Sequence, residues 1–522
     1  MVSLFYEVFF MRKAKLFVIN GITAAGVALL LRFTQMAFNV YLSGALGAVG
    51  MGAVSLVGSV YAPALTLALS GIQLTCTRLC AEALEQRNGK RAKKSLYGCL
   101  LYSIFFGLLS AALLYLSAPL IAEKILHAPE AEGLLKILAP SLPAAALSSC
   151  LVGYFTAVRR VSRTALSALL CQGVKIGLTV YLITLFGAEG RGVFALFAAT
   201  CLSEIAGTAL LLLMLLVEGK KDLANTGRDA NDVNRRILSI AAPLAVAAWI
   251  RSFLVSAEHV LIPKGLMKYG AGSTQALATY GRMHGMALPV IFFPTAILTA
   301  FTSLLIPEIS RFHAENKKKE IGATASRMLR MTLLFSLAFG MLMLFFGKEL
   351  GIALYDCSET GKLVALFAPL VPVMYLDTAT DAILKGLDEQ VYCMKINILD
   401  AALSLLMVFF LVPRMGAAGY VLTVFLSECF NTLFSLWRLC KRTELSLPPL
   451  RCLILPLFSA LLAAGGAKSV LTLFGTLSVL PSLLLGCTLF LALYTLLLRL
   501  TGSFDKADRR YFGKLLPLGA KS

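Results

Sequence analysis

The strongest constraint on this chain is a series of apolar runs that recur from Leu16 to Leu500. Each run has about 20 residues, the length at which a helix crosses the roughly 30 Å hydrocarbon core of a bilayer. The polar stretches between the runs are too short for a large soluble domain. A 58% hydrophobic composition and a mean hydropathy of +0.81 agree with this pattern. The sequence therefore predicts an all-α polytopic membrane protein.

Apolar windows and their polar interruptions predict about 14 transmembrane helices. The first window has no small-residue cleavage site behind it, so we expect a retained helix and not a removed signal peptide. A basic cluster follows Met11, which leaves open whether Met1 or Met11 is the start. The predicted spans lie near 16–42, 48–72, 95–118, 134–158, 164–187, 192–217, 237–260, 273–304, 328–347, 363–384, 396–413, 417–437, 452–474 and 477–500.

The net charge of +20 comes mostly from loops that fall on one side of the membrane if the spans alternate. By the positive-inside rule this side is cytoplasmic, and it holds both termini. The positive charge is mostly a signal of topology and adds some attraction to anionic membrane lipid, so we do not expect a nucleic acid partner. The basic segments include QRNGKRAKK, VRRVSR, HAENKKKE and the C-terminal tail.

The sequence carries no pattern typical of an enzyme or of a bound cofactor. There is no Gly-rich phosphate loop, the four histidines are scattered, and the 12 cysteines form no CxxC pair. We therefore expect a transporter without metal or cofactor.

A repeated motif predicts two related halves. GVFALFAATCLSE at 192–204 and GAAGYVLTVFLSE at 416–428 share their spacing, although two Leu/Ala/Gly-rich strings can also match by chance. Six helices per half is an even number, so both halves enter the membrane in the same direction and form a parallel repeat. The predicted parts are an N-terminal bundle at 1–217, a cytoplasmic linker at 218–236, a C-terminal bundle at 237–440, and helices 13 and 14 with a basic tail at 441–522.

The run at 258–310 carries a family resemblance. Its segments IPKGL, ATYGRMHGMALP, FFP and LIPEIS resemble the stage V sporulation protein B family of polysaccharide and lipid-linked oligosaccharide flippases, in the multidrug/oligosaccharidyl-lipid/polysaccharide exporter superfamily. The resemblance implies two six-helix bundles around a V-shaped central cleft that opens to alternate faces. It also implies that helices 13 and 14 form a groove for a lipid tail.

Charged residues within spans usually face a bundle interior and indicate a pathway. Arg32, Gln35 and Asn39 share one face of the first helix, and we expect this face to bind substrate. A structural ion pair, or a side chain that reaches the membrane surface, is the alternative for Arg32. Arg282, with Thr279 and His284, is the corresponding candidate in the eighth helix.

The eighth helix also contains breaks. Gly281 and Gly285 lie four residues apart and predict close approach of a neighbouring helix. Pro289 and Pro294 predict kinks, and Pro63 predicts a similar kink in the second helix. These prolines are either hinges of a moving transporter or rigid bends.

Acidic residues supply candidates for ion coupling. Asp377, Asp381 and Lys385 lie four residues apart in turn, so we expect Asp381 to pair with Lys385 and leave Asp377 for a proton or Na⁺. Glu204 and Glu428 end the repeated motif and are expected to pair within each bundle, with Glu428 a further coupling candidate.

The leading functional hypothesis is a flippase that moves a polyprenyl-diphosphate-linked oligosaccharide across the bacterial cytoplasmic membrane. The resemblance favours a peptidoglycan precursor, with the spore cortex and the forespore membrane as its setting. In lipid II flippases the functional arginines lie in helices 1, 2 and 8. Arg32 and Arg282 match by helix alone, and helix 2 here has no arginine before Arg78, so another wall polymer stays open. The alternatives are a cation-coupled drug or metabolite exporter of the same fold, and a scaffold that recruits wall-building enzymes.

Overall fold

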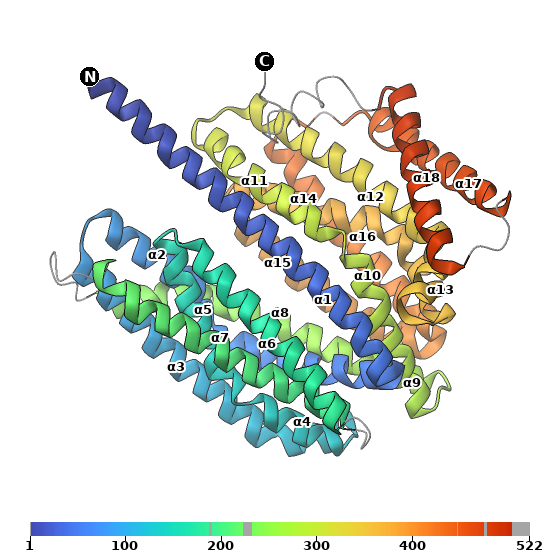
Figure 1. Cartoon of the computed structure of the whole chain (residues 1–522), viewed down its shortest axis with the longest axis horizontal. Helices are drawn as coiled ribbons and strands as arrows, with labels where there is room; N and C mark the ends of the chain where they lie inside the picture. Colours follow the sequence, from blue (N-terminus) through green and yellow to red (C-terminus); the bar gives the residue numbers. More distant parts are fainter. Residues whose placement is uncertain (1, 187–190, 223–231, 446, 474–477, 504–522) are drawn as a thin grey trace. The chain divides into compact units, whose positions relative to one another are not determined.

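The computed structural model describes residues 2–186, 191–222, 232–445, 447–473 and 478–503. Every regular element in these ranges is a helix (Figure 1). This confirms the predicted all-α class.

Among the described residues, 12 helices are long and apolar enough to span a membrane. This count differs from the predicted 14 spans at two places. The first two predicted spans are counted as one, because α1 (Val2–Leu69) comprises two helices that meet at a kink at Gly47, where φ is +65°. The predicted span at 273–304 is divided among α9 (Ser273–Tyr280), η3 (Gly281–Ala287), α10 (Leu288–Phe292) and the start of α11 (Thr295–Ala314). Pro289 and Pro294 at the last two junctions lack the backbone N–H that a continuous helix uses.

Helix contacts group the chain into two compact units, and the first comprises residues 1–281 and 401–420. It contains the C-terminal half of α15 (Gln390–Met415) and the first residues of α16 (Ala417–Arg442). The other elements of this unit are α1, α2 (Ile72–Glu85), α3 (Gly89–Leu120), η1 (Ile121–Leu126), α4 (Glu130–Leu138), α5 (Ser141–Ala157), α6 (Val161–Phe186), α7 (Gly192–Asp222), α8 (Val233–Lys268) and α9 (Ser273–Tyr280).

Helices of the first unit bury small side chains and expose large apolar ones. On α3 the buried face includes Ser103, Gly107 and Ser110, whereas Leu101 and Phe105 are exposed. This arrangement is typical of membrane helices, because lipid solvates large apolar groups and close helix packing requires small ones.

The second unit comprises residues 282–400 and 421–522, and the boundary between the units falls within η3 (Gly281–Ala287) and again within α15 and α16. Its further elements are α10 (Leu288–Phe292), α11 (Thr295–Ala314), α12 (Lys318–Tyr355), α13 (Ser358–Phe367), η4 (Ala368–Leu370), α14 (Val371–Gly386), η5 (Leu450–Ile454), α17 (Leu455–Leu473) and α18 (Val479–Leu500).

Helices α17 and α18 lie side by side and pack on α12 (Figure 1). Alanines of α17 and the aromatic rings of Phe490 and Tyr494 bury against the α12 face that carries Phe346. Tyr494 donates a hydrogen bond to the Leu334 carbonyl at 3.0 Å. The C-terminal helix pair is therefore an integral part of this unit.

The predicted six-plus-six repeat and the boundaries at 217, 236 and 440 stay predictions. Residues 223–231 of the predicted linker lie outside the described ranges.

Candidate functional site

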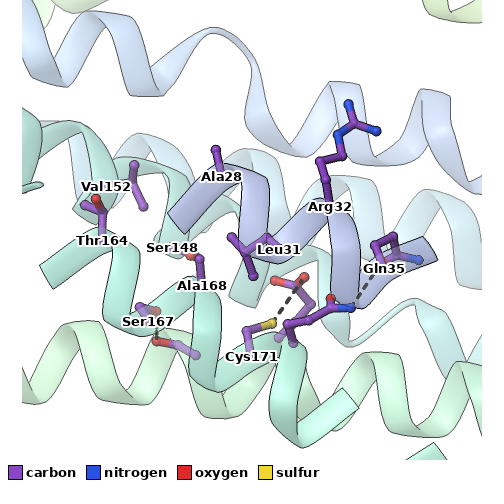
Figure 2. A pocket seen from close by; sticks show the side chains of 13 residues that line it. Ala28, Leu31, Arg32, Gln35, Ser148, Val152, Thr164, Ser167, Ala168 and Cys171 are labelled. Atoms are coloured by element: carbon purple, nitrogen blue, oxygen red, sulfur yellow. Dashed lines mark hydrogen bonds between the residues drawn. The ribbon is translucent and has the colours of Figure 1, made fainter. Parts of the chain in front are cut away.

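A pocket of about 550 Å³ lies within the first unit, among α1, α5, α6 and α7; we call it the α1–α6 pocket. Ser167, Cys171 and Glu204 give it a polar interior, while α1 contributes Arg32 and Gln35. Figure 2 shows Arg32 and Gln35 on α1 beside the side chains of α5 and α6. The lining residues are Ala28, Leu31, Arg32, Gln35, Ser148, Val152, Thr164, Ser167, Ala168, Cys171, Gln172, Glu204 and Gly207.

Two of the three residues predicted on the first helix line this pocket. Gln35 accepts a hydrogen bond from the Gln172 amide at 3.1 Å, which connects α1 to α6. Arg32 is exposed, and its side chain extends away from Ser167 and Cys171 in Figure 2. Asn39 is half-buried on α1 and is not among the lining residues. The α1 side of the pocket thus carries an exposed cation, Arg32, and an amide pair, Gln35 with Gln172.

Within the part of the chain that the structure describes, Arg32 has no ion-pair or hydrogen-bond partner. An arginine inside a span costs on the order of 3 kcal/mol to insert. Glu204, the acid of the pocket, interacts with residues other than Arg32. Its Oε1 lies 3.9 Å from the Cys171 thiol, and Lys175 acts on it electrostatically. Arg32 therefore remains available to an anionic ligand.

The sequence TYGRMHGMALP contains η3, a π-helical turn between α9 and α10. Such turns arise where an extra residue enters a helix, and they are frequent at functional sites. In η3, Arg282 forms an ion pair with Glu359 at the start of α13. Arg282 and His284 are both half-buried. Arg282, the second cation predicted to bind substrate, is therefore paired with an acid of its own unit.

The remaining predicted residues of this region lie in or next to helix ends. Thr279 is half-buried near the end of α9. Pro289 lies in the first turn of α10, and Pro294 directly precedes α11. Pro63 is buried inside α1 without ending it. Whether these prolines act as hinges stays a prediction.

In the second unit, acids and amides of α14, α15 and α16 form a polar cluster. The Asn431 amide donates to Asp377 at 3.3 Å and to Asn397 at 3.2 Å. Asn431 is 6% exposed, and its carbonyl oxygen, like Asp377 Oδ1, has no hydrogen-bond partner among the described residues. Glu428 acts on Asp377 electrostatically.

The neighbours of this cluster follow the sequence prediction in part. Lys385 lies 3.4 Å from Asp381, which confirms the predicted pair. Ser427 donates to Asp400, an acid to which the sequence assigned no role. Free acceptor oxygens in a buried polar cluster favour a bound cation or proton.

A second pocket of about 570 Å³ was not predicted from the sequence; we call it the α1–α8 pocket. It contains Arg251, which the sequence places inside a span without a partner or a role. The indication in the sequence was Ser55 and Ser59 on one helix and Ser252 and Ser256 on the other, because each pair is four residues apart and so lies on one helical face. The lining residues are Ser55, Gly58, Ser59, Ala62, Thr66, Ala248, Arg251, Ser252, Val255, Ser256 and His259.

Sequence comparison finds two matching family models and several related proteins. The model of the polysaccharide biosynthesis protein family matches residues 17–313, and that of the lipid II flippase MurJ matches residues 273–497. Stage V sporulation protein B of Bacillus subtilis is 24% identical over 73% of this chain and 75% of its own. The lipid II flippase MurJ of the same organism is 22% identical over 71% and 72%.

Structural comparison gives the fold. Lipid II flippase MurJ in an inward closed conformation has a TM-score of 0.70 at 12% identity, over 92% of this chain and 99% of that one. An inward-facing multidrug resistance MATE family transporter of the MOP superfamily has a TM-score of 0.62 at 16% identity, over 81% and 99%. The expectation of a transporter and not an enzyme is confirmed. With its MATE/MurJ fold and a family match over more than half of its length, this chain belongs to the polysaccharide biosynthesis protein family of membrane transporters.

Proposed function

We propose that this protein flips a polyprenyl-diphosphate-linked oligosaccharide across the bacterial cytoplasmic membrane by alternating access. The observation that carries the proposal is Arg32, an arginine without a protein partner among the described residues that lines a polar pocket of about 550 Å³. Similarity to the lipid II flippase MurJ supports a peptidoglycan precursor as the substrate, and similarity to stage V sporulation protein B supports a role in sporulation. The spore cortex and the forespore membrane are the proposed setting.

The chemistry of the α1–α6 pocket fits such a substrate. A guanidinium binds phosphate oxygens with two parallel hydrogen bonds, and these strengthen where water is excluded. Gln35 and Gln172, already bonded to each other, present amides that suit sugar hydroxyls. The lipid tail stays in the bilayer, so the pocket needs to hold the polar head alone. Asn39 and Thr279 are proposed to contact sugars further along the oligosaccharide. Arg282 and His284 are proposed to bind the diphosphate once Arg282 has separated from Glu359.

The polar cluster around Asp377 is proposed to couple transport to an ion gradient. Its carboxylate and amide oxygens without partners are hard ligands of the kind that Na⁺ prefers, and the carboxylate alone can accept a proton. Asp381 and Glu428 contribute further negative charge nearby. Both termini are proposed to be cytoplasmic, because the basic loops then face the anionic leaflet.

One observation favours a cation-coupled exporter as the second candidate. The α1–α6 pocket contains Glu204, and a carboxylate in the N-terminal bundle could bind a driving cation. Arg32 in the same pocket disfavours cationic drugs as substrates, because like charges repel there. Glu204→Gln separates the two candidates: it abolishes the export of cationic compounds if the exporter is correct and leaves oligosaccharide flipping largely intact if the flippase is correct.

The primary experiment is a complementation assay for flipping. Cells depleted of their own lipid II flippase express this chain, and externally accessible lipid-linked precursor is measured. Wild type is expected to restore accessible precursor, and Arg32→Ala to reduce it about 10-fold or more through the loss of charge-assisted hydrogen bonds.

Arg235→Ala is the matched control, because Arg235 is exposed at the start of α8 and lines neither pocket. All variants are compared at equal membrane abundance. A wild-type protein that inserts into the membrane and restores no accessible precursor contradicts a peptidoglycan substrate. Equal flipping by wild type and Arg32→Ala contradicts the role of the pocket.

The scaffold alternative requires that wall-building enzymes mislocalise without this chain, even when flipping is supplied by another protein.

A further inference from the structure

Ion pairs at the ends of α7 and α16 have opposite polarity at corresponding positions. Glu218 lies 14 residues after Glu204, which ends the first repeated motif (218 − 204). Arg442 lies 14 residues after Glu428, which ends the second (442 − 428). One helix therefore carries an acid where the other carries a base. Each of these two side chains has an ion-pair partner in the connection between the two preceding helices.

In the first unit, Glu218 lies between two arginines, and we call these three residues the α7 clamp. Arg160, in the connection between α5 and α6, places its Nη1 3.2 Å from Glu218 Oε2. Arg163, in the first turn of α6, places its Nη2 2.6 Å from Oε1. The Glu218 side chain is 23% exposed, so solvent screens these pairs only in part. One carboxylate thus holds the end of α7 against the start of α6.

In the second unit the charges are reversed, because an acid of the connection lies between two arginines of α16. We call Glu389, Arg438 and Arg442 the α16 clamp. Arg438 donates from Nε to Oε2 at 3.1 Å and from Nη2 to Oε1 at 3.0 Å, which is a bidentate pair. Arg442 places its Nε 2.5 Å from Oε1, and the Glu389 side chain is 12% exposed. This carboxylate holds the end of α16 against the connection between α14 and α15.

The two connections have the same backbone geometry. Each contains a residue in the left-handed region directly after its first helix has ended, Arg159 with a φ of +61° and Asp388 with a φ of +62°. The next residue, Arg160 or Glu389, donates its backbone N–H to the carbonyl five residues earlier at 2.9 Å. The side chains of Arg160 and Glu389 therefore start from equivalent positions, and they differ in the sign of their charge.

The geometry of the two clamps distinguishes them from ordinary surface ion pairs. An isolated exposed pair contributes little to stability, because water and salt screen it. In each clamp one partly shielded carboxylate contacts two guanidinium groups, and charge-assisted hydrogen bonds of this kind are the stronger ones. Removal or reversal of that carboxylate leaves two neighbouring arginines without it as their counter-charge. Each clamp is thus a point at which its unit can be opened locally.

We propose that the α7 clamp and the α16 clamp keep the ends of α7 and α16 closed during transport, and that their opposite polarity selects the correct helix for each connection. If α16 met the connection between α5 and α6, arginine would face arginine. If α7 met the connection between α14 and α15, glutamate would face glutamate. This repulsion disfavours an exchange of the two related helices. The proposal goes beyond the flippase function, because it concerns how each unit assembles and keeps its shape.

Local hydrogen exchange tests the α7 clamp on the full chain in detergent. Glu218→Arg gives the end of α7 the charge of α16, so the amides of residues 155–165 are expected to exchange about 10-fold faster or more than in wild type. Glu218→Arg combined with Arg160→Glu copies the polarity of the α16 clamp and is expected to restore most of the wild-type protection. Unchanged exchange in Glu218→Arg, or no recovery in the double variant, overturns the proposal.

The α16 clamp is tested in the same way at residues 384–394. Glu389→Arg is expected to speed exchange there by about 10-fold or more, and its combination with Arg438→Glu to restore protection. Glu218→Gln and Glu389→Gln cover the case in which the arginine variants do not fold. Each removes the charge and keeps the size of the side chain, so faster exchange is expected at its own connection. Unchanged exchange in both overturns the proposal.

Glu85→Arg is the matched control for an added positive charge. Glu85 is exposed at the end of α2 and belongs to neither clamp. Both connections are expected to exchange as in wild type. Faster exchange at both connections in this control would show a general effect of charge and overturn the proposal.

The flipping assay on the same variants connects the clamps to transport. At equal membrane abundance, Glu218→Arg and Glu389→Arg are expected to lose flipping, and the two double variants to recover it. Full flipping by a variant whose connection exchanges fast overturns the role in transport. Hydrogen exchange includes no transport step, so a chain that flips no oligosaccharide still reports whether the clamps hold.

Discussion

Gly281 and Gly52 meet backbone to backbone where α9 crosses α1. A Cβ on Gly281 would lie 2.5 Å from the Gly52 nitrogen and 2.1 Å from the Ala48 carbonyl oxygen. A Cβ on Gly52 would lie 2.2 Å from the carbonyl oxygen of Leu277. Close approach, and not backbone torsion, is the reason for glycine here, because φ of Gly281 is −61°.

Gly281→Ala and Gly52→Ala are expected to destabilise the protein by about 1–3 kcal/mol each, because the added methyl group forces the two backbones apart. The measurement is the free energy of unfolding in detergent. Gly44→Ala is the control on α1, since a Cβ there has open space around it. Equal stability of all three variants would show that the contact is looser than described.

Substitution of either member of the Arg282 and Glu359 pair is expected to have different effects. Glu359 is 59% exposed, so Glu359→Gln is expected to change the free energy of unfolding by less than about 1 kcal/mol and to retain flipping. Arg282→Ala is expected to reduce flipping about 10-fold if the arginine binds diphosphate. The complementation assay and an unfolding titration measure both. Equal losses in both variants contradict substrate binding and identify the ion pair itself as the requirement.

Asp377→Asn is expected to uncouple transport from its ion gradient, since it keeps the shape of the side chain and removes the charge that would hold a cation. The measurement is flipping in proteoliposomes with an imposed Na⁺ or pH gradient. Asp388→Asn is the control: Asp388 is exposed beyond the end of α14, with a φ of +62° that asparagine adopts readily. Unchanged gradient dependence in Asp377→Asn rules out this coupling site.

The protein is expected to be less stable at acid pH because protonation of Glu389, which lies between α14 and α15, weakens its ion pairs. Burial raises the pKa of its carboxyl, but hydrogen bonds from Arg438 at 2.8–3.1 Å and an ion pair with Arg442 outweigh it, so the pKa lies below the ordinary 4.5. A lowered folded pKa means that the stabilisation is complete above pH 4.5 and is lost as the pH falls through the folded value.

Glu389→Gln is therefore expected to be less stable than wild type at pH 7 by about 1–3 kcal/mol, with a difference that shrinks below pH 4.5. Thermal unfolding in detergent between pH 7 and pH 3.5 measures this. A constant difference over the whole range would mean that Glu389 contributes by packing and not by charge.

The order of the helices and their approximate number follow from apolar length, since a span needs about 20 apolar residues wherever it lies. The sequence predicted the two helices of α1 but not the way in which they are joined. Gly47 joins them with one residue in the left-handed region instead of a polar loop, and glycine occurs at many other positions without such a role. The π-helical turn of η3 was equally hidden, because its register depends on packing around Gly281 and Arg282.

The site residues that could be predicted are charged and polar side chains within apolar spans, because few such residues occur there. Arg32 and Gln35 were predicted together from helical spacing, and they line one pocket. The partner of Arg282, Glu359, lies 77 residues along the chain (359 − 282), and no local pattern connects them. Arg251 was visible as a charge, but its significance comes from serines on α1 that are near it only in the folded protein.

The packing of α17 and α18 on α12 limits how this chain can be shortened. Gly486 lies so close to Phe346 that a Cβ there would be 2.6 Å from its ring. A chain that ended after Arg442 would expose this α12 surface to lipid, which dissolves apolar side chains but does not fill a surface shaped for alanine and glycine. A transporter without α17 and α18 cannot be obtained from this sequence by deletion alone; the exposed side of α12 would first have to be redesigned.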